Sequence, residues 1–178
     1  MLTPDYPEFA RLAAGHTLVP VVRTISADLQ TPVTAFLSVA AEEPHAFLLE
    51  SVERGERIGR YTFLGARPYM VVTARGDEVT IERRGKKQKH KGIVFELVGK
   101  LLAEHQAAQL PGLPPFTAGA VGYFSYDVVR RLEKLPARAK DDLHLPDGVL
   151  MFFDRLLAFD HLKHQLHLIA AVDVREES

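Results

Sequence analysis

The chain has 178 residues, of which 47% are hydrophobic and 25% charged, and its formal net charge is −1. This near-neutral charge gives no general attraction for nucleic acid or an anionic membrane, and the absence of cysteine excludes disulfides, thiolate metal sites and a cysteine nucleophile. The N-terminus has no basic stretch followed by an apolar run, and no apolar run reaches the roughly 20 residues that span a bilayer. We therefore expect a soluble, cytoplasmic protein.

The first residues of the chain predict a short helix. Thr3 is suited to cap a helix and Pro4 to fill its first turn, and Phe9 and Leu12 would then face the core. Residues 18–25 are apolar and β-branched, which predicts a strand.

The same cap-then-proline signal recurs at Thr31-Pro32 and predicts a second helix over 33–41. Four strands are expected next, over residues 46–52, 60–64, 69–75 and 78–84. Gly76-Asp77 predicts that the last two form a hairpin, although the order is reversed from the preferred Asp-Gly.

The clearest amphipathic helix is predicted over 93–109, where Ile93, Leu97 and Leu101 recur every four residues. A basic turn over 85–92 precedes it, and a cluster of prolines at 111–115 ends it.

The last third predicts a strand over 118–123, a helix over 125–132 and a polar loop over 136–146. Residues 150–160 and 165–174 predict a second hairpin around a turn at 161–164. Together the elements predict an α+β fold, mostly antiparallel sheet with a few packed helices.

Motifs that would name a chemistry are missing from the sequence. There is no GxxxxGK[ST] phosphate loop and no HExxH zinc motif. Gly119-Ala120-Val121-Gly122 lacks the third glycine of a dinucleotide fingerprint, so we interpret its small residues as permitting close backbone packing. No acidic pair has a spacing that singles out catalytic residues, and no catalytic residue is predicted.

Two clusters of ionisable residues have ordinary structural explanations. His161, His164 and His167 lie near one turn, and we interpret them as a solvated hairpin tip rather than a metal site, because His164 and His167 would point to opposite faces of a strand. The basic run 83–91 lacks the interleaved aromatics of a nucleic-acid surface, and a solvated turn is the default interpretation.

The segment Phe47-Leu48-Leu49-Glu50-Ser51-Val52 leaves two interpretations open. In the first, it is an apolar strand at whose end Ser51 terminates the ladder. In the second, it lines an amino-acid site, where Glu50 or nearby carbonyls accept from the ammonium, Ser51 and Arg60 bind the carboxylate, and Leu49 forms an apolar wall.

The chain resembles the N-terminal region of anthranilate synthase component I nearly from end to end. The resemblance is carried, in order, by residues 19–21, 28–33, 48–53, 59–65 with Pro68, 119–127, 145–147 and 159–161. No single segment decides it, but together and at this spacing they are specific. Thr62 and Ala120 depart mildly from the family pattern, where serine and glycine are common.

The resemblance implies a function. The family enzyme is a lyase that uses Mg²⁺ to convert chorismate and ammonia to anthranilate and pyruvate, with ammonia supplied by a glutaminase subunit, component II. Tryptophan inhibits it at a separate site, which in this chain would include Leu49, Glu50, Ser51 and Arg60. The catalytic residues and Mg²⁺ ligands would lie in a C-terminal chorismate-binding domain, so residues 1–178 would form an inactive regulatory region that binds no cofactor itself.

Three alternatives stay open. Aminodeoxychorismate synthase component I, from folate synthesis, shares the architecture, although residues 28–33 favour anthranilate synthase. A stand-alone amino-acid-binding module would bind tryptophan without any enzyme domain, and a purely structural interaction domain would bind no ligand.

Overall fold

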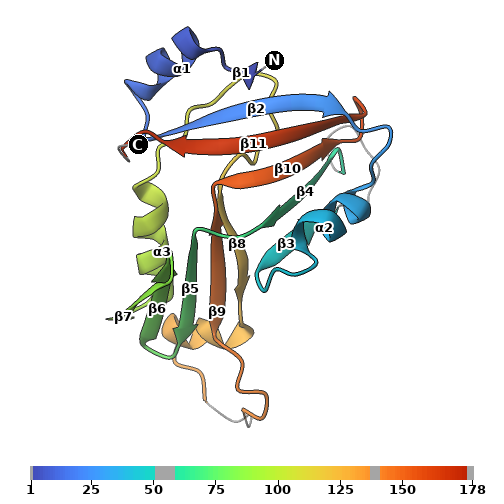
Figure 1. Cartoon of the computed structure of the whole chain (residues 1–178). Coiled ribbons are helices and arrows are strands. Elements are labelled where there is room, and N and C mark those ends of the chain that lie inside the picture. The colour runs from blue at the N-terminus through green and yellow to red at the C-terminus, as the bar shows by residue number, and fades with distance from the viewer. Residues whose placement is uncertain (1, 51–58, 137–140, 176–178) are drawn as a thin grey trace. The chain divides into compact units, whose positions relative to one another are not determined.

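The computed structural model describes residues 2–50, 59–136 and 141–175 (Figure 1). The chain forms two compact units. The first consists of Met1–Pro68, Glu104–Gly119 and Phe153–Ser178, and the second of Tyr69–Ala103 and Ala120–Phe152. Each is built around one sheet, and the expected α+β fold with mostly antiparallel strands is confirmed.

The first unit contains a six-stranded sheet in the order β1-β2-β11-β10-β4-β3, in which every neighbouring pair is antiparallel. Its strands are β1 (Leu2–Thr3), β2 (Leu18–Ser26), β3 (Ala46–Leu49), β4 (Tyr61–Ala66), β10 (Arg155–Asp160) and β11 (Gln165–Asp173). Alternate residues enter two apolar clusters. One contains Leu64 and Phe159 and is covered by α2 (Pro32–Ala40), and the other contains Val22 and Ala158.

The first helix, α1 (Tyr6–Ala13), begins later than predicted. Its cap is Asp5, whose carboxylate accepts from the Glu8 N–H at 3.0 Å. The prediction of Thr3 as cap was wrong because Thr3 belongs to β1, where it pairs with β2. The inward positions are confirmed, since Phe9 and Leu12 pack in one apolar cluster.

Thr31 caps α2 as predicted. Its hydroxyl accepts from the Thr34 N–H at 3.2 Å, and the Thr34 hydroxyl accepts from the Thr31 N–H at 3.0 Å. This reciprocal pair is a capping box, and Pro32 fills the first turn without losing a hydrogen bond.

The second unit contains a five-stranded sheet in the order β7-β6-β5-β9-β8. Its elements are β5 (Met70–Arg75), β6 (Glu78–Arg83), β7 (Lys86–Lys91), α3 (Val94–Ala103), β8 (Gly119–Phe124), the 3₁₀ helix η1 (Tyr126–Arg131) and β9 (Gly148–Phe153). The hairpin at Gly76-Asp77 is confirmed, and β5, β6 and β9 pack with α3 around Val72, Val98 and Phe152.

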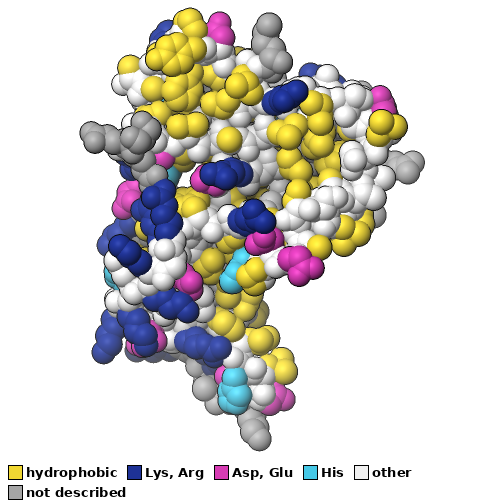
Figure 2. Space-filling view, in the orientation of Figure 1, with side chains coloured by type: hydrophobic (Ala, Val, Ile, Leu, Met, Phe, Trp, Pro, Cys, Tyr) yellow, Lys and Arg dark blue, Asp and Glu magenta, His cyan; other side chains and the backbone are white. Residues whose placement is uncertain are grey.

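The basic segment is a strand and not only a turn, which corrects the prediction for 85–92. Lys86–Lys91 pairs along its whole length with β6, through a tight turn in which Arg84 and Gly85 have φ of 49° and 76°. Figure 2 shows Lys and Arg side chains gathered over this hairpin.

Two further predictions had wrong boundaries. The helix predicted to 109 ends at Ala103, because the following residues pair with β2: the Leu18 N–H donates to the Gln106 carbonyl and the Ala108 N–H to the Leu18 carbonyl. Residues 150–160 are two strands, because β9 ends at Phe153 and pairs with β5, whereas β10 begins at Arg155 and pairs with β4 and β11 of the other sheet.

Candidate functional site

The predicted amino-acid site falls at the end of β3. Leu49 is the last residue of the strand, pairs with Phe63 of β4 and leaves 48% of its surface exposed. Glu50 follows it and is exposed. Ser51 lies outside the described residues. An apolar side chain and a carboxylate are therefore presented to solvent next to each other at this strand end.

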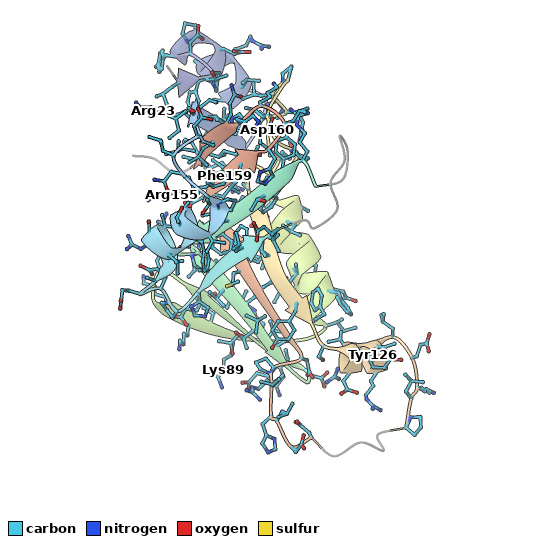
Figure 3. All side chains as sticks on the ribbon, turned by 90° about the vertical axis from the view of Figure 1, so that its right-hand side faces the viewer. Arg23, Lys89, Tyr126, Arg155, Phe159 and Asp160 are labelled. Carbon is cyan, nitrogen blue, oxygen red and sulfur yellow. The ribbon has the colours of Figure 1, made fainter. Side chains whose placement is uncertain are left out.

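Arg60 immediately precedes β4 and is held by Asp160. Asp160 is the last residue of β10 and is labelled in Figure 3. Nε of Arg60 donates to Oδ1 at 3.1 Å and Nη2 donates to Oδ2 at 2.7 Å. The Asp160 side chain is 1% exposed and that of Arg60 is 25% exposed. The carboxylate is thus buried while the guanidinium reaches the surface. Cζ of the guanidinium lies 4.8 Å from the centroid of the Tyr61 ring.

The surroundings keep this pair charged. Burial alone raises the pKa of Asp160, but hydrogen bonds from Arg60 and from the Lys163 and Leu162 N–H groups outweigh burial and hold that pKa below its usual range. The hydrogen bond to Asp160 raises the pKa of Arg60 above its ordinary value. Burial, followed by the charge of Asp160, raises the pKa of Tyr61.

The three histidines near the β10–β11 turn do different things. His161 and His164 are exposed in the turn, as predicted, and Nε2 of His161 hydrogen-bonds to the buried Thr62 hydroxyl at 2.7 Å. The prediction was wrong for His167, which is buried within β11, with Nδ1 2.9 Å from the Thr24 hydroxyl. Burial lowers the pKa of His167, so this ring is neutral at pH 7.

Within the ranges that the structure describes, no three His, Asp or Glu side chains gather into a group that could hold a metal ion.

The structure brings three of the four predicted site residues to one end of the sheet. Because β3 and β4 are antiparallel and Leu49 pairs with Phe63, the chain at Glu50 runs toward the Arg60 end of β4. Asp160 was missed as a partner of this group. Its sequence signals were its place just before a predicted turn, which equally suits an ordinary turn residue, and its membership of the segment 159–161, and neither connects it to Arg60.

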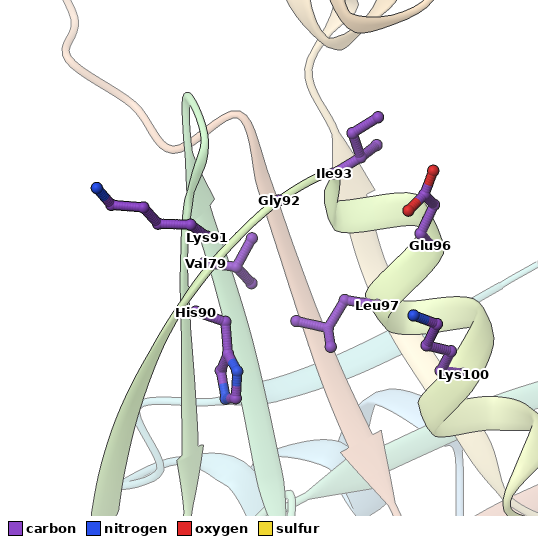
Figure 4. A pocket seen from close by; sticks show the side chains of 8 residues that line it. All are labelled: Val79, His90, Lys91, Gly92, Ile93, Glu96, Leu97 and Lys100. Carbon is purple, nitrogen blue, oxygen red and sulfur yellow. The ribbon is translucent and has the colours of Figure 1, made fainter.

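A separate pocket of about 130 Å³ lies in the second unit, between the end of β7 and α3 (Figure 4). It is lined by Val79, His90, Lys91, Gly92, Ile93, Glu96, Leu97 and Lys100. None of the predicted site residues lines it.

The small-residue segment at β8 has the structural role predicted for it. A Cβ added to Gly122 would lie 1.9 Å from the carbonyl oxygen of Val149 in β9. Close approach of these two strand backbones therefore requires glycine at this position.

Comparison with known proteins decides the family. Residues 44–178 match the family described as chorismate binding enzyme. The chain belongs to this family. Chorismate binding enzymes with similar sequences include proteins named anthranilate synthase component 1, at 38% identity in Acetivibrio thermocellus, 39% in a Synechocystis strain and 41% in Mycobacterium tuberculosis, over 94–100% of this chain. The chain spans about a third of the length of these relatives, 33–35% in each case.

The fold is that of a solved member of the same group. The crystal structure of anthranilate synthase component I from Streptococcus pneumoniae matches 88% of this chain, and 33% of its own chain, with a TM-score of 0.55 and 22% sequence identity. In the described part of the chain, helices are too short or too polar to cross a membrane.

Proposed function

We propose that this chain is the N-terminal, regulatory part of an anthranilate synthase component I, a lyase that forms anthranilate and pyruvate from chorismate. The observation that carries the proposal is identity of 38–41%, over nearly the whole chain, to relatives of that name. Residues 1–178 would act as one regulatory region beside a C-terminal chorismate-binding domain, which would hold Mg²⁺. A glutaminase subunit, component II, would supply ammonia.

Tryptophan is the proposed effector, and its site would contain Leu49, Glu50, Ser51 and Arg60. The described geometry supports this in three ways. Leu49 offers exposed apolar surface, Glu50 offers an exposed carboxylate for an ammonium group, and the guanidinium of Arg60 reaches the surface at the same end of the sheet. An amino acid requires these three kinds of partner together.

Inhibition requires tryptophan to bind one state of the complete enzyme more tightly than the other, with typical couplings of about 1–3 kcal/mol. Replacing Ser51 with phenylalanine would fill the proposed site. We expect the complete enzyme with Ser51→Phe to form anthranilate at tryptophan concentrations that inhibit the wild type. An unchanged half-inhibitory concentration would show that the site is elsewhere.

Catalysis is proposed to lie outside this chain. Anthranilate is fluorescent, so its formation from chorismate, ammonium and Mg²⁺ can be followed directly. We expect the complete protein to form it and the 178-residue chain to form none. Anthranilate formation by the 178-residue chain would contradict its assignment as a regulatory region. Formation of aminodeoxychorismate by the complete protein would instead show that the enzyme is not an anthranilate synthase.

A further inference from the structure

Asp160 is held in place more firmly than an ordinary turn residue. Its Oδ1 accepts from the N–H groups of Leu162 and Lys163, at 3.1 and 3.2 Å, in addition to Nε of Arg60, and its Oδ2 accepts from Nη2 of Arg60. With its side chain 1% exposed, the carboxylate has little freedom to turn. The plane of the Arg60 guanidinium is therefore set by the β10–β11 turn.

The same turn also fixes the main chain at Arg60. The His161 N–H donates to the Arg60 carbonyl at 2.9 Å, and the His161 ring is joined to the neighbouring Thr62 hydroxyl. The backbone and the side chain of Arg60 are therefore both fixed by residues about 100 positions away in sequence.

The pair has a geometry suited to presenting a cation. Asp160 takes two of the N–H groups of Arg60, and a guanidinium has five, so this pairing does not exhaust its donors. The buried partner is the anion, and the cation lies toward the surface at the end of the sheet where Leu49 and Glu50 are exposed. Replacement of buried ion pairs by apolar groups is often neutral or stabilising, so stability is a weak reason for this arrangement.

We infer that Asp160 is a positioning residue that orients Arg60 to bind the carboxylate of an amino-acid effector. The inference rests on the proposed effector site and adds to it a residue from the opposite end of the sequence. A guanidinium binds a carboxylate well only when its fork is correctly oriented, and the bidentate contact with Asp160 fixes that orientation before the ligand arrives.

The test is a double-mutant cycle on the dissociation constant for L-tryptophan, measured by equilibrium dialysis on the complete protein. Asp160→Asn keeps the shape of the side chain but places an amide N–H₂ against the guanidinium. We expect it to weaken binding about tenfold. Arg60→Gln should weaken binding at least as much, and the double variant no more than Arg60→Gln alone. A residue that only stabilised the sheet would instead add its own loss to that of Arg60→Gln.

The chain offers a matched control in Asp173, which forms the same kind of bidentate pair with Arg175 at the other end of β11, at 2.9 and 2.6 Å. Asp173→Asn should leave the dissociation constant within about twofold of the wild type, because this pair is far along the strand from the proposed site. An equal loss in both variants would mean a general effect on the fold and would overturn the inference.

If Asp160→Asn does not fold, Arg60→Lys decides. Lysine keeps the charge but has no planar fork for Asp160 to orient, so we expect a loss close to that of Arg60→Gln. Two results would overturn the positioning role and leave the effector site intact. The first is wild-type affinity in Arg60→Lys. The second is wild-type affinity in a folded Asp160→Asn variant when Arg60→Gln binds weakly. Wild-type affinity in both Arg60→Gln and Ser51→Phe overturns the effector site itself.

Discussion

Gly122 is the position where a single methyl group should do most damage to the second unit. A Cβ at this residue would lie 1.9 Å from the Val149 carbonyl oxygen, 2.8 Å from its carbon and 2.9 Å from the Cα of Leu150. All three atoms are backbone, so no side chain can rotate away. Ordinary contact begins at 3.4 Å, which means that β8 and β9 must move apart by about 1.5 Å locally.

A movement of this size exceeds the tolerance of the strand hydrogen bonds, which span about 2.7–3.2 Å. Each lost bond costs about 1 kcal/mol and overpacking a further 1–3 kcal/mol, so Gly122→Ala should lower the free energy of unfolding by roughly 2–4 kcal/mol. Urea unfolding of the 178-residue chain at pH 7, followed by circular dichroism, measures this change.

The matched control is Gly99→Ala, in the exposed middle of α3, where an added Cβ meets no atom within 4 Å. Alanine is the better helix former by about 1 kcal/mol, so this variant should be more stable than the wild type. A Gly122→Ala chain that unfolds within about 0.5 kcal/mol of the wild type would refute the close-packing argument.

Three further predictions concern the first unit. Gly65→Ala would bring a Cβ to 2.6 Å from the Phe47 ring, and we expect it to lower the free energy of unfolding in urea by about 1–3 kcal/mol. Adding Phe47→Leu should restore most of that loss, and a loss that persists in the double variant would locate the strain elsewhere. Arg175 lowers the pKa of Asp173 from 3.8 to about 2, so this pair stabilises the fold above about pH 4 and its contribution disappears as the pH falls toward 2. The pKa change corresponds to roughly 2 kcal/mol, which solvent screening at Arg175 reduces to about 1 kcal/mol. Asp173→Asn should remove that part of the acid dependence of the free energy of unfolding. An unchanged pH profile of stability would show that the pair does not contribute. Thr31→Ala removes the α2 cap and should cost about 1 kcal/mol, whereas Thr31→Ser should cost little; equal losses would exclude the cap as the cause.

Local signals predicted those parts of the fold that local chemistry determines. The cap at Thr31 and the Gly76-Asp77 hairpin each depend on a few adjacent residues, and both are present in the structure. The strand β7 was missed because all but one of its side chains are exposed, so its sequence shows no alternation between apolar and polar residues. Its pairing depends instead on the turn at Arg84 and Gly85.

Pairing between residues far apart in sequence determines the features that local patterns did not predict. The 93–109 pattern is helical in period, yet backbone hydrogen bonds to Leu18 take over beyond Glu104. The same holds for the candidate site. Leu49, Glu50 and Arg60 were predicted from one short segment, whereas Asp160 joins Arg60 only because β10 lies beside β4 in the sheet. No local pattern connects residues that are 100 positions apart.

The segment that ends β3 is the proposed tryptophan-binding segment. The most direct test is equilibrium dialysis of labelled L-tryptophan against the complete wild-type protein and its Ser51→Phe variant, since binding is measured without reference to turnover. We expect saturable binding by the wild type, and none by the variant at concentrations up to about one hundred times the wild-type dissociation constant. Equal dissociation constants for the two proteins would contradict this proposal.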